Sequence, residues 1–267
     1  MATYYIEYDS GESGDGTLDD PFHVDSTTDL DDILDGTYTN STEAVSGDEY
    51  VFLDGNYGSV FINNADKNGV LFAALNDSQA IFTVFPGKYH SGGSADYECN
   101  GLFIDHYHGG SNINRYNNKL TLKGGRVHLE GSNRIGYNGN FLECHWKQLE
   151  LYIKNTYTEW FRNPGGAQTF DNCSIILDTS YGGPRFAHTL SPTFRDCIIS
   201  SQDSEVTLSH SSSFGSTTSN NWVHNCTGTL PDNIGTADPI FEDPANLKFR
   251  LNMVNSPCIG RGLGSWL

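Results

Sequence analysis

Five residues in the middle of the chain have side chains suited to binding a charged sugar. They are Trp160, Arg162, Arg185, His128 and Glu130. A Trp ring stacks on a sugar ring, and an Arg guanidinium pairs with a carboxylate or sulfate through two hydrogen bonds. The set therefore predicts a face that binds an acidic saccharide. The alternative is a solvated sheet face, on which Glu130 and Arg162 form an exposed cross-strand pair.

These side chains share a face only if the strands that carry them are aligned. The alignment places four apolar residues on the inner side of successive strands: Leu129, Phe161, Phe186 and Leu208. Their neighbours then point outward, because side chains alternate along a strand. A slip of one residue would turn the face inward.

A short phrase that recurs five times supplies the framework for those strands. Its copies are Phe103-Ile104-Asp105-His106, Phe141-Leu142-Glu143-Cys144, Phe170-Asp171-Asn172-Cys173, Phe194-Arg195-Asp196-Cys197 and Val223-His224-Asn225-Cys226. Their first residues are 38, 29, 24 and 29 positions apart, which is typical of a repeat with loops inserted into some copies. The runs between copies are short and β-rich, without a sustained helical period. The sequence therefore predicts an all-β fold of the β-solenoid type.

Stacked coils place equivalent residues over one another, about 4.8 Å apart. The phrase then predicts a structural ladder with two polar or thiol columns. One column, at a bend where amides cap backbone groups, is Asp105, Glu143, Asn172, Asp196 and Asn225. The other is Cys144, Cys173, Cys197 and Cys226, interpreted as packed free thiols. Metal binding by these cysteines is the alternative, but the C-x-x-C spacing is absent.

Three segments resemble the right-handed parallel β-helix proteins of the pectate-lyase-like superfamily. The start is similar in Tyr4-Tyr5-Ile6, Gly14-Asp15-Gly16-Thr17 and Pro21-Phe22, and the first coil in Gly47-Asp48-Glu49-Tyr50-Val51-Phe52-Leu53-Asp54-Gly55-Asn56-Tyr57. The end is similar in Asp238-Pro239-Ile240-Phe241, Phe249-Arg250-Leu251 and Ser256-Pro257-Cys258-Ile259-Gly260. The resemblance implies a single-stranded right-handed parallel β-helix with an N-terminal cap. It says little about activity, because unrelated functions share this scaffold.

For catalysis, the resemblance implies a Lys or Arg base, often with Ca²⁺ held by clustered acids. Candidates of the right type are Lys123, Lys154 and Arg162, none of which lies in a catalytic motif of that superfamily. The catalytic residues are therefore unknown from the sequence. A Ca²⁺ site at Asp15, Asp19 and Asp20 competes with a solvated loop, because the EF-hand pattern is absent. No other cofactor is expected.

The charge is the informative part of the composition. Lys and Arg number 15 and Asp and Glu 33, giving a formal net charge of −18. Residues 1–66 contain 16 acids and no Lys or Arg. So acidic a chain argues against nucleic acid or an anionic membrane as partner, and suits a saline setting or Ca²⁺. No apolar run approaches a membrane span, and the N-terminus lacks the features of a signal peptide.

The predicted organisation is one structural domain in three parts. Residues 1–46 form an N-terminal cap, with a short helix near 25–34 whose N-cap is Ser26, Thr27 or Thr28. Residues 47–226 form the β-helix body, and residues 227–267 a C-terminal closing segment.

Among β-helix proteins without an export signal, the chain resembles virion-surface proteins such as phage tailspikes, head fibres and decoration proteins. The resemblance implies a structural role with binding of host-surface polysaccharide, and assembly as a homo-oligomer, typically a trimer, or with other virion proteins. It places the chain on the virion surface, with an extracellular location as the alternative. The alternative function is a polysaccharide lyase or glycoside hydrolase acting on an acidic polysaccharide.

Overall fold

The computed structural model describes residues 1–11, 14–60, 69–83, 96–108, 116–131, 141–155, 159–161, 168–178, 185–187, 192–202, 206–209, 218–227, 230, 232–246 and 248–261. The chain divides into two compact units, which are described separately. Unit 1 comprises residues 1–106 and 116–126, and unit 2 comprises residues 107–115 and 127–267. The boundaries predicted at residues 46 and 226 stay predictions.

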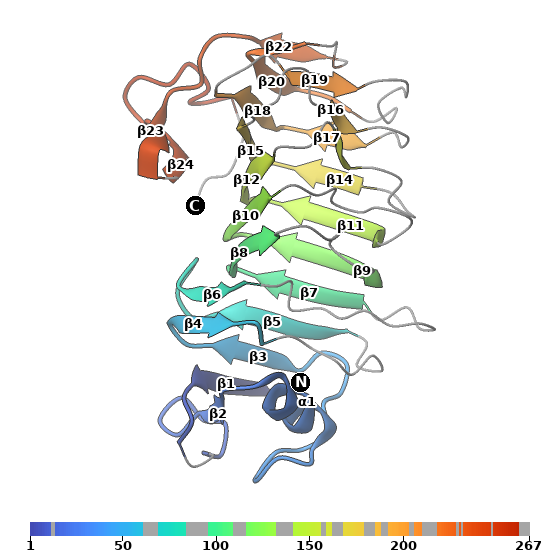
Figure 1. The fold of residues 1–267 in the computed structure, drawn as a ribbon, viewed down its shortest axis with the longest axis vertical. Helices are drawn as coiled ribbons and strands as arrows, with labels where there is room; N and C mark the ends of the chain where they lie inside the picture. The colour runs from blue at the N-terminus through green and yellow to red at the C-terminus, as the bar shows by residue number, and fades with distance from the viewer. Residues whose placement is uncertain are drawn as a thin grey trace. The chain divides into compact units, whose positions relative to one another are not determined.

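Unit 1 is a stack of coils that contribute strands to two parallel sheets (Figure 1). The first sheet has the order β9-β7-β5-β3-β1-β2, and the second β8-β6-β4. Its strands are β1 (Thr3–Tyr8), β2 (Phe22–Val24), β3 (Glu49–Phe52), β4 (Gly55–Gly58), β5 (Val70–Ala74), β6 (Ala80–Phe82), β7 (Asp96–Asn100), β8 (Phe103–His108) and β9 (Tyr116–Lys123). Registers such as Tyr50↔Phe72 and Phe72↔Cys99 place one residue of each coil over the next.

The core of unit 1 is built from aromatic rings stacked from coil to coil. The ring centroids of Tyr4 and Tyr50 are 5.2 Å apart, and those of Tyr50 and Phe72 are 6.0 Å apart. Tyr57 stacks on Phe82 at 5.0 Å and donates its hydroxyl hydrogen to the Ile6 carbonyl. Burial raises the pKa of both Tyr50 and Tyr57, so both rings stay neutral in the core.

A short helix, α1 (Thr27–Asp35), covers β2 at the N-terminal end of unit 1 (Figure 1). Its apolar residues Leu30, Ile33 and Leu34 recur at helical spacing and are all buried. The N-cap is Ser26, and the helix stops at Gly36, whose φ of 71° suits a residue without a side chain. The helix predicted near residues 25–34, including its cap, is therefore confirmed.

The start of α1 is held by a reciprocal pair of hydrogen bonds, a capping box. The Asp29 backbone N–H donates to Ser26 Oγ at 3.3 Å, and the Ser26 backbone N–H donates to Asp29 Oδ2 at 3.0 Å. Partial burial alone would raise the pKa of Asp29, but hydrogen bonds from Ser26 and Asp25 outweigh it and lower the pKa below its ordinary 3.8. The stabilisation by the carboxylate is therefore present above pH 3.8 and is lost as the pH falls through the lowered folded-state value.

The substitution Asp29→Ala is expected to lower the free energy of unfolding by about 1 kcal/mol at pH 7. The difference from wild type should shrink as the pH falls below 3.8 and through the lowered folded-state pKa of Asp29, where the carboxylate becomes protonated. Urea unfolding followed by circular dichroism at several pH values measures both quantities. Because its hydrogen bond to Asp29 raises the pKa of Asp25, the comparison is repeated in an Asp25→Asn background. A pH-independent difference would contradict the role of the charge.

Unit 2 is a second stack of coils, with three parallel sheets and one hairpin (Figure 1). Within it, sheet A has the order β17-β14-β11, sheet B β22-β20-β18-β15-β12-β10, and sheet C β13-β16-β19-β21. The strands are β10 (Arg126–Gly131), β11 (Phe141–Lys147), β12 (Glu150–Asn155), β13 (Glu159–Phe161), β14 (Gln168–Asp171), β15 (Ser174–Asp178), β16 (Arg185–Ala187), β17 (Thr193–Arg195), β18 (Ile198–Ser201), β19 (Val206–Ser209), β20 (Asn221–His224), β21 (Cys226–Thr227), β22 (Asn233–Gly235), and the antiparallel pair β23 (Phe241–Asp243) and β24 (Lys248–Leu251), joined by the 3₁₀ turn η1 (Pro244–Asn246). The predicted all-β, parallel β-solenoid class is confirmed in both units.

A single residue in the left-handed conformation turns the chain from sheet A into sheet B in each coil. These residues are Gln148, Asn172, Asp196 and Asn220, with φ between 51° and 55°. The N–H of Asn172 donates to the Arg195 carbonyl of the next coil at 2.9 Å, and the N–H of Gln148 to the Asp171 carbonyl at 2.9 Å. Asn and Asp tolerate this conformation, and stacked coils give each of these N–H groups a partner.

The residue after each turn points into a dry interior. Leu149, Cys173, Cys197 and Asn221 occupy this position, and all are fully buried. The Cys197 thiol donates to the Phe170 carbonyl at 3.3 Å, and the Asn221 amide donates to the Phe194 carbonyl at 3.0 Å. Beside them, the rings of Trp146, Phe170 and Phe194 stack at 5.6 and 4.9 Å.

The predicted ladder is therefore correct only for the third and fourth copies of the phrase. Phe170 pairs with Phe194, but Cys144 pairs with Gln168 and Cys226 with Val206, so these two cysteines lie outside the column of Cys173 and Cys197. Asn225 turns the chain from sheet B into sheet C, and Asp105 lies within β8, so neither shares the bend of Asn172 and Asp196. Glu143 lies in β11, before the bend rather than in it. The physical reason is that the step between paired residues differs among the sheets. It is 24 residues for β11–β14, β14–β17 and β15–β18, but 26 residues for β13–β16 and 22 residues for β16–β19.

Candidate functional site

The outer face of sheet B carries three columns of side chains, set by its registers. Along β12, Leu151 and Ile153 point inward, so the alternating Glu150, Tyr152 and Lys154 point outward. Following the registers through β15, β18 and β20 gives the columns Glu150–Ser174–Ile198–Trp222, Tyr152–Ile176–Ser200–His224 and Lys154–Asp178–Gln202.

The described residues 236–246 and 248–261, which we call the C-terminal strap, fold back over two of these columns (Figure 1). The ring centroids of Phe249 and Tyr152 are 5.1 Å apart, and the two rings are stacked. Phe241 packs against the cluster that these two residues form with Ile176. Leu251 and Cys258 pack on Ile198 and Trp222 in a second cluster. The strap buries apolar side chains that would otherwise face water. This explains why the outer face of sheet B carries apolar residues.

Two ring nitrogens of β20 tie the start of the strap to sheet B. Trp222 Nε1–H donates to the Ala237 carbonyl at 2.8 Å. His224 Nδ1 lies 3.1 Å from the Thr236 carbonyl oxygen. A carbonyl oxygen only accepts, so Nδ1 carries the hydrogen and Nε2 is the acceptor nitrogen of the neutral ring. The strap thereby fixes the His224 tautomer.

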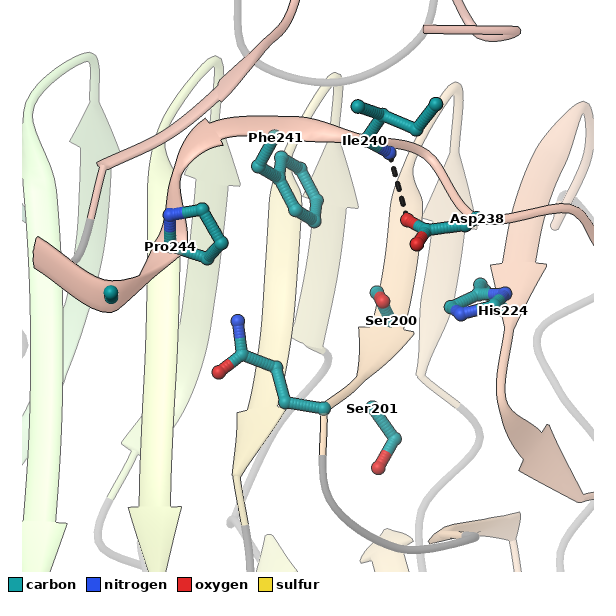
Figure 2. A pocket seen from close by; sticks show the side chains of 9 residues that line it. Ser200, Ser201, His224, Asp238, Ile240, Phe241 and Pro244 are labelled. Carbon is teal, nitrogen blue, oxygen red and sulfur yellow. Dashed lines mark hydrogen bonds between the residues drawn. The ribbon is translucent and has the colours of Figure 1, made fainter.

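Between the strap and sheet B lies a cavity of about 400 Å³, which we call the strap pocket. Its lining comprises Ser200, Ser201, Gln202 and His224 from the sheet side, and Asp238, Ile240, Phe241, Pro244 and Ala245 from the strap. Figure 2 shows the Asp238 carboxylate and the Phe241 ring on the strap side, with Ser200 and His224 opposite. Its volume is within the range of small-molecule sites, and it combines apolar walls with convergent polar groups.

The strap turn above the pocket is held in a strained conformation. Ile240 has a φ of 51°, which is rare for a β-branched residue and costs about 1–3 kcal/mol. The Ile240 N–H donates to Asp238 Oδ1 at 2.9 Å, and the Ile240 carbonyl accepts from the Asn252 N–H at 2.9 Å. These bonds fix the direction of the Asp238 side chain relative to the cavity.

The structure places the four described members of the predicted saccharide-binding set on two different sheets. His128 and Glu130 lie on β10 in sheet B, whereas Trp160 and Arg185 lie on β13 and β16 in sheet C. In sheet C, Glu159 pairs with Arg185 and Phe161 with Ala187, so Trp160 takes the register position of Phe186 rather than that of Arg185. The predicted alignment was wrong by one residue at this strand, and Arg162 lies outside the described residues.

His128 and Glu130 belong instead to a cluster on the outer face of sheet B. The His128 ring lies 4.9 Å from the Tyr152 ring, and Lys154 Nζ is 3.1 Å from Glu130 Oε1. The Tyr152 hydroxyl donates to Asp178 Oδ2 at 2.5 Å. Hydrogen bonding and attraction from Glu130 raise the pKa of Lys154, which keeps it protonated. A general base needs the opposite shift, so this environment does not suit Lys154 as the predicted catalytic base.

The other predicted candidates are not among the residues that line the strap pocket. Lys123 is an exposed residue at the end of β9 in unit 1. Asp15 caps a turn, because its carboxylate accepts from the Thr17 N–H at 3.1 Å, and the hydrogen bonds from Thr17 lower the pKa of Asp15. Within the described part of the chain, no group of three or more His, Cys, Asp or Glu side chains is arranged to hold a metal ion, including Asp15, Asp19 and Asp20.

The pocket residues Ser200, His224, Asp238 and Phe241 were not predicted as site residues. The Asp238-Pro239-Ile240-Phe241 motif was one sequence signal, interpreted as part of the closing segment. Among the helices of the described residues, none is long and apolar enough to cross a membrane. No protein-family model, curated protein or solved structure matches this chain. The site is therefore the basis for its proposed function.

Proposed function

We propose that this chain is a virion-surface β-solenoid protein, of the tailspike, head-fibre or decoration type, that binds host polysaccharide in the strap pocket. The observation that carries the binding role is the lining of the pocket, which combines the Phe241 ring with hydroxyl, amide, imidazole and carboxylate groups. The virion role and the trimeric assembly rest on the resemblance to such β-helix proteins and on the solenoid fold.

The mixture of side chains around the pocket suits a sugar ring. A sugar has an apolar face that packs on an aromatic ring, and a rim of hydroxyl groups that both donate and accept. Asp238 and His224 Nε2 can accept from such hydroxyls, and the Gln202 amide can do both. Charge-assisted hydrogen bonds of the Asp238 type are about twice as strong as neutral ones.

The charge of the pocket favours a neutral sugar. Its described lining contains the carboxylate of Asp238 and neither Lys nor Arg, within a chain of net charge −18. A uronate or sulfate group would therefore be repelled, in contrast to the acidic ligand expected from Arg162 and Arg185. Glycoside hydrolysis needs two carboxyl groups about 5–9.5 Å apart. The described lining supplies one carboxylate, which supports binding rather than cleavage.

The substitution Asp238→Asn is expected to weaken binding of a neutral polysaccharide about tenfold or more, because a hydrogen bond to a charged group contributes about 1.5–3 kcal/mol. Phe241→Leu, which keeps an apolar side chain for packing, should weaken it about fivefold through loss of the ring. A glycan array carrying neutral and uronate polymers identifies the ligand class, and calorimetry on the bound polymers measures affinity.

The matched control is Glu242→Gln, which removes an exposed acid of β23 that does not line the pocket. This variant should bind as wild type does. Equal affinity of wild type, Asp238→Asn and Phe241→Leu would exclude the strap pocket as the site. Binding restricted to uronate polymers would contradict the proposed neutral ligand, and new unsaturated ends, detected by absorbance, would indicate a lyase instead.

A further inference from the structure

A strip of polar side chains leaves the strap pocket and crosses successive coils of sheet B. It consists of Gln202, which lines the pocket, then Asp178, Lys154 and Glu130. The register Lys154↔Asp178 and the hydrogen bond from the Gln202 N–H to the Leu177 carbonyl place these positions one coil apart. With about 4.8 Å between coils, three steps from Gln202 to Glu130 extend roughly 14 Å along the solenoid axis.

The strip has a wall along one side. In the neighbouring column, Tyr152 and Ile176 are covered by Phe249 and Phe241 of the strap, and Tyr152 is only 6% exposed. In contrast, the Lys154 side chain is 50% exposed and that of Glu130 is 34% exposed. The strap therefore bounds an open row of polar groups, and the same Phe241 ring takes part in both the wall and the pocket.

The side chains of the strip are positioned before any ligand arrives. Glu130 holds Lys154 through a 3.1 Å ion pair, and the Tyr152 hydroxyl holds Asp178. Along the row, a carboxylate, an ammonium group, a second carboxylate and an amide follow one another. The row therefore offers hydrogen-bond acceptors and donors in turn. That alternation fits a row of hydroxyl groups better than a row of like charges, because an anionic chain would meet Glu130 and Asp178 as well as Lys154.

We propose that the strip is the extension of the strap pocket that binds a linear neutral oligosaccharide, with a sugar ring in the pocket and the following rings lying along the solenoid axis over Gln202, Asp178 and Lys154. This inference rests on the proposed saccharide binding in the pocket and adds the length and direction of the ligand. Successive coils repeat the same outward position, so each further sugar unit meets an equivalent polar group.

The test measures affinity against chain length by calorimetry, with linear neutral glucans of α-1,4, β-1,4 and β-1,3 linkage and from two to six units. In at least one series, the affinity should rise about tenfold or more between two and six units, because added sugar units gain hydrogen bonds on the strip. Asp178→Ala, which alters the strip and not the pocket lining, should lower the affinity for six units about three- to tenfold and leave that for two units nearly unchanged.

The pocket variant Asp238→Asn separates the two proposals, because it should weaken short and long glucans equally. Glu242→Gln again serves as the exposed control on the strap. Binding of two units with no gain up to six, or no effect of Asp178→Ala on six units, would overturn the strip and leave the pocket intact. Absence of binding to all three series would overturn the pocket proposal for neutral glucans, and the strip with it.

Discussion

Replacing Phe170 with alanine is expected to lower the free energy of unfolding of unit 2 by about 3–5 kcal/mol. The Phe170 ring is fully buried and stacks between two neighbouring coils. Its centroid is 5.6 Å from that of Trp146, with an interplanar angle of 11°, and 4.9 Å from that of Phe194, with an angle of 16°. Removing it leaves a cavity between coils whose backbones are fixed by ladder hydrogen bonds, so the site cannot collapse.

Urea unfolding monitored by tryptophan fluorescence measures this loss, because Trp146 lies against the mutated ring. Phe170→Leu should cost clearly less, since most of the volume remains. Met253→Ala is the surface control: Met253 is 65% exposed on the strap, and its loss should change the free energy by no more than about 0.5 kcal/mol. A loss below about 1 kcal/mol for Phe170→Ala would mean that the stacked rings do not hold the coils together.

The fold class could be predicted because every coil repeats the same physical demands. The interior accepts only apolar side chains, and the bend after sheet A accepts residues that tolerate a left-handed backbone. The copies at Phe170 and Phe194 show both demands in identical positions. Helix α1 was predictable for a different reason, since its cap and its apolar spacing are local in sequence.

The full ladder could not be predicted because the demands do not fix residue identity. The inward ring position holds Trp146 in one coil and Phe170 in the next, and the bend holds Gln148 where Asn172 follows. The repeated pattern of Phe and Cys therefore pointed to Phe141 and Cys144. Both lie before Trp146, the residue that pairs with Phe170. In sheet C the same ambiguity amounted to one residue, which aligns Trp160 with Phe186 instead of Arg185.

The strap pocket had no periodic signal at all. Ser200 and His224 are ordinary outward positions of β18 and β20, and Asp238 and Phe241 come from a segment that has left the repeat. These residues meet because the apolar outer face of sheet B attracts the strap back over it. The apolar residues Tyr152, Ile176 and Ile198 at outward positions were the available signal, and this signal becomes recognisable only once the register of each strand is known.

Replacing Asn221 with alanine is expected to lower the free energy of unfolding of unit 2 by about 2–4 kcal/mol. Asn221 is fully buried at the position that Cys173 and Cys197 occupy in the preceding coils. Its Oδ1 accepts from the Cys197 N–H at 3.0 Å, and its Nδ2 donates to the Phe194 carbonyl at 3.0 Å. Truncation leaves the Cys197 N–H in the interior without its partner, at a cost of about 1–3 kcal/mol. The Phe194 carbonyl loses one of two bonds, because it still accepts from the Ser219 N–H at 2.9 Å.

Two further variants of Asn221 distinguish hydrogen bonding from volume in the same unfolding measurement. Asn221→Cys should cost about half as much as Asn221→Ala, because a thiol here can still donate to the Phe194 carbonyl, as Cys197 donates to Phe170. Asn221→Asp should become more stable as the pH falls, because burial raises the folded-state pKa of the new carboxyl and its protonated form restores the donor. Asn225→Gly, at an exposed bend with a φ of 51°, is the control and should cost no more than about 1 kcal/mol. If Asn221→Ala and Asn225→Gly cost the same, the paired amide of Asn221 does not stabilise the last coils.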